Sequence, residues 1–181
     1  MKFTPTPLPG SFEIQPQVFE DGRGTFYRYY DRDEFAAIGF DGEWVQLNHS
    51  YTTTRGTIRG MHYQRPPHGE IKLVKCIAGG VLDVIVDIRQ GSATFLQSYA
   101  IELSADNRKM LYIPAGFAHG FQALENNSEL IYHHSTVYSP AAEAGLKFDD
   151  PLLDIRWPLP AMLVSERDRS HAVIDTNFKG I

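Results

Sequence analysis

The sequence contains one cysteine, Cys76, among 181 residues. A single cysteine excludes an internal disulfide and any zinc site built from several cysteines, and it suits a reducing compartment, so we expect a cytoplasmic protein. Long hydrophobic runs are missing too, because the longest apolar stretch, Val81–Ile88, is interrupted by Asp83 and Asp87. We therefore expect no membrane partner. Three prolines and no apolar segment occupy Met1–Gly10, which disfavours a secretory signal.

Positively charged residues are also few, since the sequence has 17 Lys and Arg against 22 Asp and Glu, which gives a formal net charge of −5. This balance argues against a nucleic-acid-binding surface. Hydrophobic residues make up 43% of the chain and aromatic residues 12%, which is enough for a folded core. No linker, repeat or low-complexity segment divides the chain, so residues 1–181 are predicted to form a single domain.

Helix signals are scarce and strand signals are many. Only Arg32–Ile38, followed by Gly39, has a helical pattern. Nine runs rich in β-branched and aromatic residues are bounded by Gly, Pro and Asn. They are Thr25–Tyr30, Trp44–Ser50, Thr57–Gln64, Ile71–Ala78, Val81–Arg89, Phe95–Ser104, Lys109–Ile113, Gly120–Leu124 and Glu129–Tyr138. Such a chain is predicted to be all-β, as a sandwich or a small barrel.

Several of these strands are apolar on both faces. In Ile71–Ala78, Lys72 shares one face with Val74 and Cys76, and the other face is also largely apolar. The outer face needs a cover, either the second sheet of a sandwich or a further layer that another subunit could provide. Lys72 itself either extends its ammonium group to the surface or holds it inside a barrel, where it would stabilise a developing oxyanion.

The histidines do not form an evident metal site. Pro114–His119 (PAGFAH) fits PxGxxH, the second half of the cupin barrel signature, but the first half would need an HxH pair followed by Glu. Neither His62 nor His68 has that spacing, and His133 and His134 point to opposite faces of one strand. We expect a barrel without a metal ion.

Tyr132 and Tyr138 fall on the same face of the predicted strand Glu129–Tyr138. Six residues at about 3.3 Å each would separate them by roughly 20 Å, the length of an extended nucleotide sugar. One ring could serve as an acid and the other could stack on a base, or both could simply pack on a barrel face. No glycine-rich phosphate loop is present, so any diphosphate would be held by side chains such as arginine.

Seven segments, in order from about Phe12 to Asp168, resemble the dTDP-4-dehydrorhamnose 3,5-epimerases. They are Phe19–Gly24 (FEDGRG), Arg59–Gln64 (RGMHYQ), Lys72–Val74 (KLV), Val81–Arg89 (VLDVIVDIR), Ile113–Phe121 (IPAGFAHGF), Tyr138–Pro140 (YSP) and Ser165–Asp168 (SERD). The resemblance implies a cupin-type jelly-roll barrel with few short helices. It also implies a homodimer without metal or cofactor, acting on a nucleotide-diphospho-sugar.

The resemblance also implies a role for each site residue. His62 is similar to the base that removes the proton beside a ketone, and Asp168 to the carboxylate that orients it. Lys72 is similar to the cation beside the ketone oxygen, and Tyr132 to the acid that returns a proton on the opposite face. The implied substrate-binding residues are Arg23, Arg28, Gln46, Asn48, Arg59, Lys72, His119, Tyr138, Glu143 and Arg167. Among them, Tyr138 would stack on the base, while Arg28 and Arg167 stand where the family commonly has Glu and Lys.

Two features of this pattern call for an explanation. Arg59 and His62 are three residues apart, which places them on opposite faces of a regular strand. A bulge at Gly60 would re-aim one of them, and we predict it there. Arg28 reverses a charge in what we expect to be a substrate-facing strand, which bears on base identity and sugar placement.

The sequence therefore predicts an epimerase of a dTDP-4-keto-6-deoxyhexose, acting at carbons 3 and 5, as in dTDP-L-rhamnose-type deoxysugar biosynthesis. A single-site 3- or 5-epimerase would use the same catalytic residues. A noncatalytic sugar-nucleotide-binding cupin and a metal-dependent cupin are rival interpretations. The His62–Tyr132 pair argues against the first of these, and the missing HxH pair argues against the second.

Overall fold

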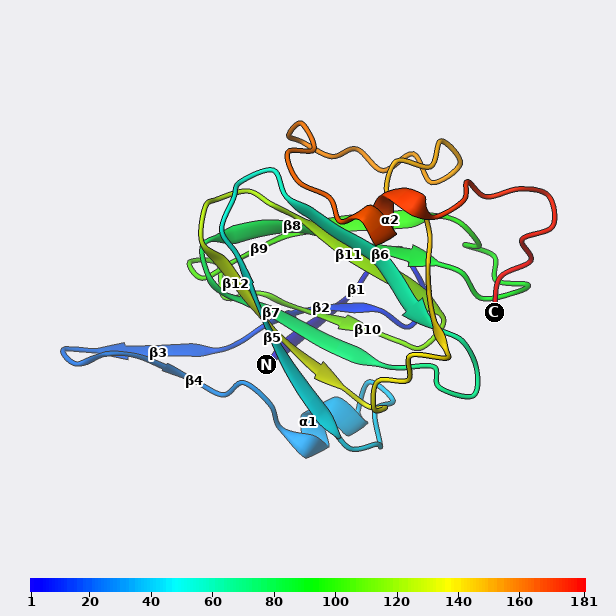
Figure 1. The fold of residues 1–181 in the computed structure, drawn as a ribbon. Coiled ribbons are helices and arrows are strands. Elements are labelled where there is room, and N and C mark those ends of the chain that lie inside the picture. The colour runs from blue at the N-terminus through cyan, green and yellow to red at the C-terminus, as the bar shows by residue number, and fades with distance from the viewer.

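Two antiparallel sheets face each other in the computed structural model, which describes residues 1–181 (Figure 1). The six-stranded sheet has the order β1-β2-β10-β7-β12-β5 and comprises Lys2–Pro5, Phe12–Gln15, Met110–Ile113, Lys72–Ala78, Ser128–His134 and Gln46–Thr52. The five-stranded sheet has the order β13-β6-β11-β8-β9 and comprises Glu143–Gly145, Ile58–Gln64, Phe117–Ala123, Gly80–Asp87 and Ser98–Ser104. The prediction of an all-β fold with few short helices is confirmed.

Two five-residue helices complete the fold, α1 (Arg32–Ala36) and α2 (Glu166–Ser170). Asp31 caps α1, since its carboxylate accepts the backbone N–H groups of Asp33 and Glu34. Gly39 follows with a φ of +94°, where a residue with a side chain would be strained. Neither helix has the length or the apolar character needed to cross a membrane.

The main core lies between the two sheets. Val74 and Cys76 of β7 are fully buried there together with Ile85 of β8 and Phe121 of β11. Leu73, the neighbour of Val74, belongs to a different cluster on the outer side of the six-stranded sheet. The alternation predicted for this strand is therefore confirmed, and it places Lys72 on the inner face.

The chain itself covers much of the outer face of each sheet. Phe35 of α1 and Phe40 pack on Leu73, and Trp44 joins their cluster. On the other side, Leu146 and Leu153 from the C-terminal segment pack on the five-stranded sheet. Near the β5 edge of the six-stranded sheet, however, Leu47, Tyr51 and Ile77 remain 60%, 47% and 40% exposed, so this part of the outer face still lacks a covering layer.

One hairpin stands away from the sheets. It consists of β3 (Val18–Asp21) and β4 (Gly24–Tyr27), which pair only with each other and project from the body of the molecule (Figure 1). Phe19 and Phe26 on this hairpin are 55% and 71% exposed. We call β3 and β4 together the arm. Large aromatic side chains left in water on a projecting element are typical of a contact with another molecule.

The predicted end of one strand, Glu129–Tyr138, is wrong. β12 stops at His134, not at Tyr138, because Ser135 ties the chain to Ile71 by two hydrogen bonds and the backbone then leaves the sheet. Tyr138 is therefore not on the strand of Tyr132, and the predicted 20 Å spacing along one strand is wrong.

Candidate active site

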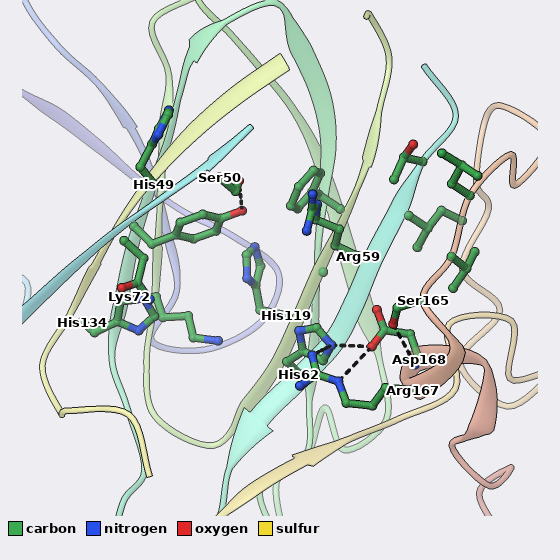
Figure 2. A pocket seen from close by; sticks show the side chains of 18 residues that line it. His49, Ser50, Arg59, His62, Lys72, His119, His134, Ser165, Arg167 and Asp168 are labelled. Carbon is green, nitrogen blue, oxygen red and sulfur yellow. Dashed lines mark hydrogen bonds and ion pairs between the residues drawn. The ribbon is translucent and has the colours of Figure 1, made fainter. Parts of the chain in front are cut away.

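A cavity of about 580 Å³ lies between the inner faces of the two sheets and extends to α2. Its volume is that of a small-molecule site. The sequence-predicted residues that line it are Asn48, Arg59, His62, Lys72, His119, Tyr132, Arg167 and Asp168. Lys72 lies with His134 on one side of the cavity, and His62, Arg167 and Asp168 lie together on the other (Figure 2).

Arg59 and His62 both reach the cavity because β6 is bulged between them. His62 pairs with His119 of β11 and Arg59 pairs with Phe121, so three steps along β6 match two along β11. Gly60, with a φ of +125°, lies in this stretch, and a Cβ there would lie 2.5 Å from the Cα of Gly120. The predicted bulge at Gly60 is confirmed.

His62 and Asp168 form a hydrogen-bonded pair, with Nε2 of His62 2.8 Å from Oδ1 of Asp168. Burial raises the pKa of Asp168, but the hydrogen bond and charge of His62 outweigh it and hold that pKa well below its usual range. Asp168 is ionised, so Nε2 carries a proton and Nδ1 is the free basic nitrogen, which has no partner in the protein.

Helix α2 presents Asp168 to the cavity. The Ser165 hydroxyl caps the helix by accepting the backbone N–H of Asp168 at 3.0 Å. Ser165 to Asp168 is an S-x-x-D capping pattern, a signal in the sequence that would have revealed this helix.

Tyr132 lies on the opposite sheet from His62, in β12. Its hydroxyl is 3.0 Å from the Ser50 hydroxyl, and burial raises the pKa of Tyr132, so the phenol stays protonated at neutral pH. Lys72 is 6% exposed, and its Nζ lies 3.0 Å from a Glu70 carboxylate oxygen. Ser50 and Glu70 are partners that the sequence analysis did not single out, although Glu70 is two residues from Lys72 and so on its side of an extended chain.

His119 is buried and its Nε2 lies 2.9 Å from an oxygen of Asp83, which is fully buried in β8. Burial lowers the pKa of His119, and the charge of Asp83 opposes this only in part. The signal for Asp83 was present in the sequence, as a carboxylate inside an apolar strand.

Three further predicted residues, Tyr138, Glu143 and Gln46, meet near Arg167 at the cavity mouth. The Tyr138 hydroxyl donates to Glu143 at 2.7 Å, and Arg167 donates to the other oxygen of Glu143 at 2.7 Å. Gln46 accepts the backbone N–H of Tyr138 at 2.9 Å. Arg167 also places Nη2 3.1 Å from Nε2 of His62, which connects the mouth to the His62–Asp168 pair.

Arg23 and Arg28 do not reach this cavity. Arg23 is at the tip of the arm, 90% exposed, and pairs with Asp21 at 2.6 Å. Arg28 follows the end of β4 and turns toward α1, 3.0 Å from Asp31 and 3.7 Å from Glu34. Within one copy of the chain, Arg28 is therefore not in a substrate-facing strand.

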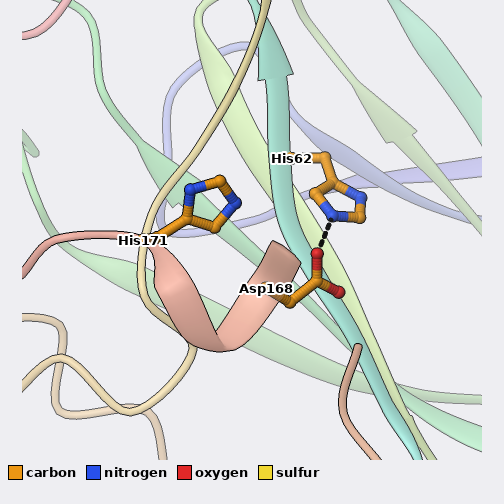
Figure 3. Close-up of side chains that lie close together, drawn as sticks. All are labelled: His62, Asp168 and His171. Carbon is orange, nitrogen blue, oxygen red and sulfur yellow. Dashed lines mark hydrogen bonds and ion pairs between the residues drawn. The ribbon is translucent and has the colours of Figure 1, made fainter. Parts of the chain in front are cut away.

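One cluster could hold a metal ion, which the sequence analysis did not foresee. The ligand atoms of His62, Asp168 and His171 lie within 4.8 Å of one another (Figure 3). The Nε2 of His62 already donates to Asp168, and the Arg167 guanidinium lies 3.1 Å from the same nitrogen, where its positive charge opposes a cation. The donor set therefore fits a metal ion poorly.

Known proteins share this sequence and this architecture. A family model described as dTDP-4-dehydrorhamnose 3,5-epimerase matches residues 5–176. The chain belongs to this epimerase family. An epimerase of that name from Pseudomonas aeruginosa is 44% identical over 172 residues, which cover 93% of each protein.

Solved structures of the epimerase family superpose closely on the chain, which has their cupin-type fold. The enzyme from Elizabethkingia anophelis has a TM-score of 0.93 at 40% identity and covers 98% of both chains. A 3′-monoepimerase from Streptomyces bikiniensis, in complex with dTDP-quinovose, has a TM-score of 0.87 at 33% identity, covering 93% of this chain and 86% of the other. The resemblance predicted from the motifs is confirmed, and one of the similar structures is named as an enzyme that acts at a single carbon.

Proposed function

We propose that this protein is an isomerase that inverts carbons 3 and 5 of a dTDP-4-keto-6-deoxyhexose, as in dTDP-L-rhamnose biosynthesis. The observation that carries the proposal is the placement of a base and an acid on opposite sheets. The His62–Asp168 pair comes from β6 and α2, Tyr132 comes from β12, and Lys72 lies in the same cavity. Binding a sugar nucleotide without chemistry would not need such a set.

The roles follow from the chemistry of a carbon beside a ketone. Nδ1 of His62 takes the proton from that carbon, and the electron pair moves onto the ketone oxygen as an enolate. The buried ammonium of Lys72 stabilises the oxyanion between the sheets, away from bulk water. Tyr132 then gives its proton to the carbon from the opposite face. Before the next turnover His62 releases its proton to solvent and Tyr132 takes one up from solvent.

The remaining predicted residues would bind the substrate. Arg59, His119 and Arg167 lie along the cavity and supply hydrogen-bond donors and positive charge suited to a sugar and its diphosphate. Tyr138 at the mouth, half-exposed, is placed to stack on the nucleotide base. Gln46, Asn48 and Glu143 would complete this end of the site.

A homodimer would bring Arg23 and Arg28 into use. No residue of the arm lines the cavity of its own subunit, so Arg23 would meet a substrate in the cavity of a second copy. The exposed Phe19 and Phe26 would be covered in that contact. We place the enzyme in the cytoplasm, without nucleic-acid or membrane partners. Light scattering should give twice the mass of 20.4 kDa, and a monomer at micromolar concentration would contradict the dimer.

Incubation with dTDP-4-keto-6-deoxyglucose in deuterated water, followed by NMR of the sugar, tests the proposed reaction. Deuterium at carbons 3 and 5 with inversion at both is the expected result. Deuterium and inversion at one carbon would assign the chain to the monoepimerases. No exchange, with dTDP still bound, would identify a binding protein.

A further inference from the structure

Glu70 occupies a central place beside the cavity without lining it. One carboxylate oxygen is 3.0 Å from Nζ of Lys72, and the other is 2.7 Å from Nδ1 of His134. The side chain is 11% exposed. Burial raises its pKa, but the hydrogen bond from His134 and the charge of Lys72 outweigh burial and lower the pKa of Glu70 to about 2. Glu70 is thus a permanent anion, so His134 must donate through Nδ1.

The hydrogen bonds on the far side of His134 continue in one direction. Nε2 of His134 accepts from the amide nitrogen of Asn48 at 3.2 Å, and Oδ1 of Asn48 accepts from the amide nitrogen of Gln46 at 3.1 Å. The oxygen of Gln46 accepts the backbone N–H of Tyr138 at 2.9 Å. Every group from Tyr138 to Glu70 therefore donates toward the carboxylate, and the orientation of each amide is set by the next group along.

We propose that Glu70 and His134 are positioning residues, of which Glu70 holds Lys72 and His134 orients Asn48 and, through it, Gln46. This inference rests on the proposed function, because it deepens the roles given there to Lys72, Asn48 and Gln46. Glu70 aims the ammonium that meets the enolate. Because His134 donates to Glu70 through Nδ1, its Nε2 accepts from Asn48, and this fixes which way the amides of Asn48 and Gln46 face the nucleotide sugar.

Because all these hydrogen bonds donate toward Glu70, Glu70→Gln is an informative change. If the new amide keeps its oxygen toward Lys72, its NH₂ faces His134, which must move its proton to Nε2. Asn48 and then Gln46 must reverse, and two donors finally meet at the backbone N–H of Tyr138. If the amide turns its NH₂ to Lys72 instead, the ammonium loses its carboxylate and faces a donor. In either case the series of hydrogen bonds is broken at one end, at Tyr138 or at Lys72.

The experiment measures turnover and binding separately for the full-length protein. Glu70→Gln is expected to lower kcat/KM by about 10–100-fold, the usual effect of removing a group that orients a reacting side chain. His134→Phe keeps a ring and leaves Glu70 with Lys72, so it should weaken dTDP binding and raise KM about tenfold while kcat changes less. Calorimetric titration with dTDP gives the affinity, and deuterium exchange gives the rate.

Glu129→Gln is the matched control. Glu129 of β12 pairs with a histidine, His49 of β5, at 2.8 Å, and both side chains are more exposed than those of the Glu70–His134 pair. The Glu129→Gln variant should keep the wild-type exchange rate and dTDP affinity. Wild-type rate and affinity in Glu70→Gln, or a change in melting temperature alone in both test variants, would overturn the inference. If the wild type itself exchanges no deuterium, the proposed function fails, and the dTDP affinities still test the orientation of Asn48 and Gln46.

Discussion

The carboxylate of Asp168 accepts the backbone N–H of Gly60 at 3.1 Å, across 108 residues of sequence. The same carboxylate holds Nε2 of His62, so a residue on α2 fixes both the bulge of β6 and the ring that the bulge delivers to the cavity. The catalytic geometry therefore depends on backbone conformation as much as on side-chain identity.

Gly60→Ala should disable the enzyme and destabilise it. A Cβ at this position would lie 2.5 Å from the Cα of Gly120 and 2.8 Å from the carbonyl oxygen of His119, at a φ that disfavours alanine. We expect a loss of about 1–3 kcal/mol in unfolding free energy and a loss of activity, because Arg59 and His62 are re-aimed. Gly22→Ala, where a Cβ meets nothing within 4 Å, is the stability control. Equal urea midpoints for the two variants would refute this prediction.

Mixed dimers test whether the arm serves the partner's cavity. Arg23→Ala and His62→Ala should each be impaired as pure proteins. Subunits from the two preparations, allowed to exchange, should regain activity, because a cavity with an intact His62 then receives an intact Arg23. Absence of recovery, with mixed dimers demonstrated by mass spectrometry, would place the action of Arg23 within its own subunit or outside catalysis.

Stability should fall as the pH drops below about 6.5. Burial lowers the pKa of His119, His133 and His171, so the unfolded chain binds more protons than the folded protein in this range. The contribution of these neutral histidines to the free energy of unfolding is complete above the unfolded-state pKa of about 6.5 and is lost progressively below it. Urea unfolding at pH 7.5, 6.5 and 5.5 should show this decline, and His133→Gln should lessen it. A free energy of unfolding that stays constant or rises on acidification would contradict the assignment.

Activity should survive exhaustive chelation. The catalytic steps assigned to His62, Lys72 and Tyr132 need no Lewis acid, and Arg167 opposes a cation beside His62. The measurement is the exchange rate after EDTA treatment and gel filtration. Loss of turnover that one divalent ion restores would show that the cluster of His62, Asp168 and His171 holds a functional metal.

The long strands could be predicted from the sequence, because runs of seven or eight residues rich in β-branched and aromatic side chains, with glycine or proline boundaries, leave little ambiguity. The four-residue strands β1, β2 and β3 and the three-residue strand β13 are too short to show a period, and they form only because neighbouring strands pair with them. α2 is equally short and depends on its Ser165 cap and on the contact of Asp168 with β6.

Some residues of the candidate site could likewise be predicted from the sequence and others could not. Lys72 and the Gly60 bulge were predictable because each breaks a local pattern, a charge in an apolar face and a glycine between two cavity-facing residues. The partners of these residues were not predictable from local patterns alone. Asp83 meets His119 and Glu70 meets His134 only when strands far apart in the sequence close around the cavity. Arg23 is the reverse case, since its motif was recognisable but its position on the arm was not.

The separate roles of His62 and Tyr132 are the central claim, and deuterium exchange measured beside inversion tests it most directly. His62→Ala should abolish both, because no enolate forms without the base. Tyr132→Phe keeps His62 and Lys72, so the enolate can form and collapse on the original face. Inversion should then fall by ~10²–10⁴-fold while exchange falls less. Equal and total loss of exchange in Tyr132→Phe, or unimpaired inversion in His62→Ala, would contradict the account.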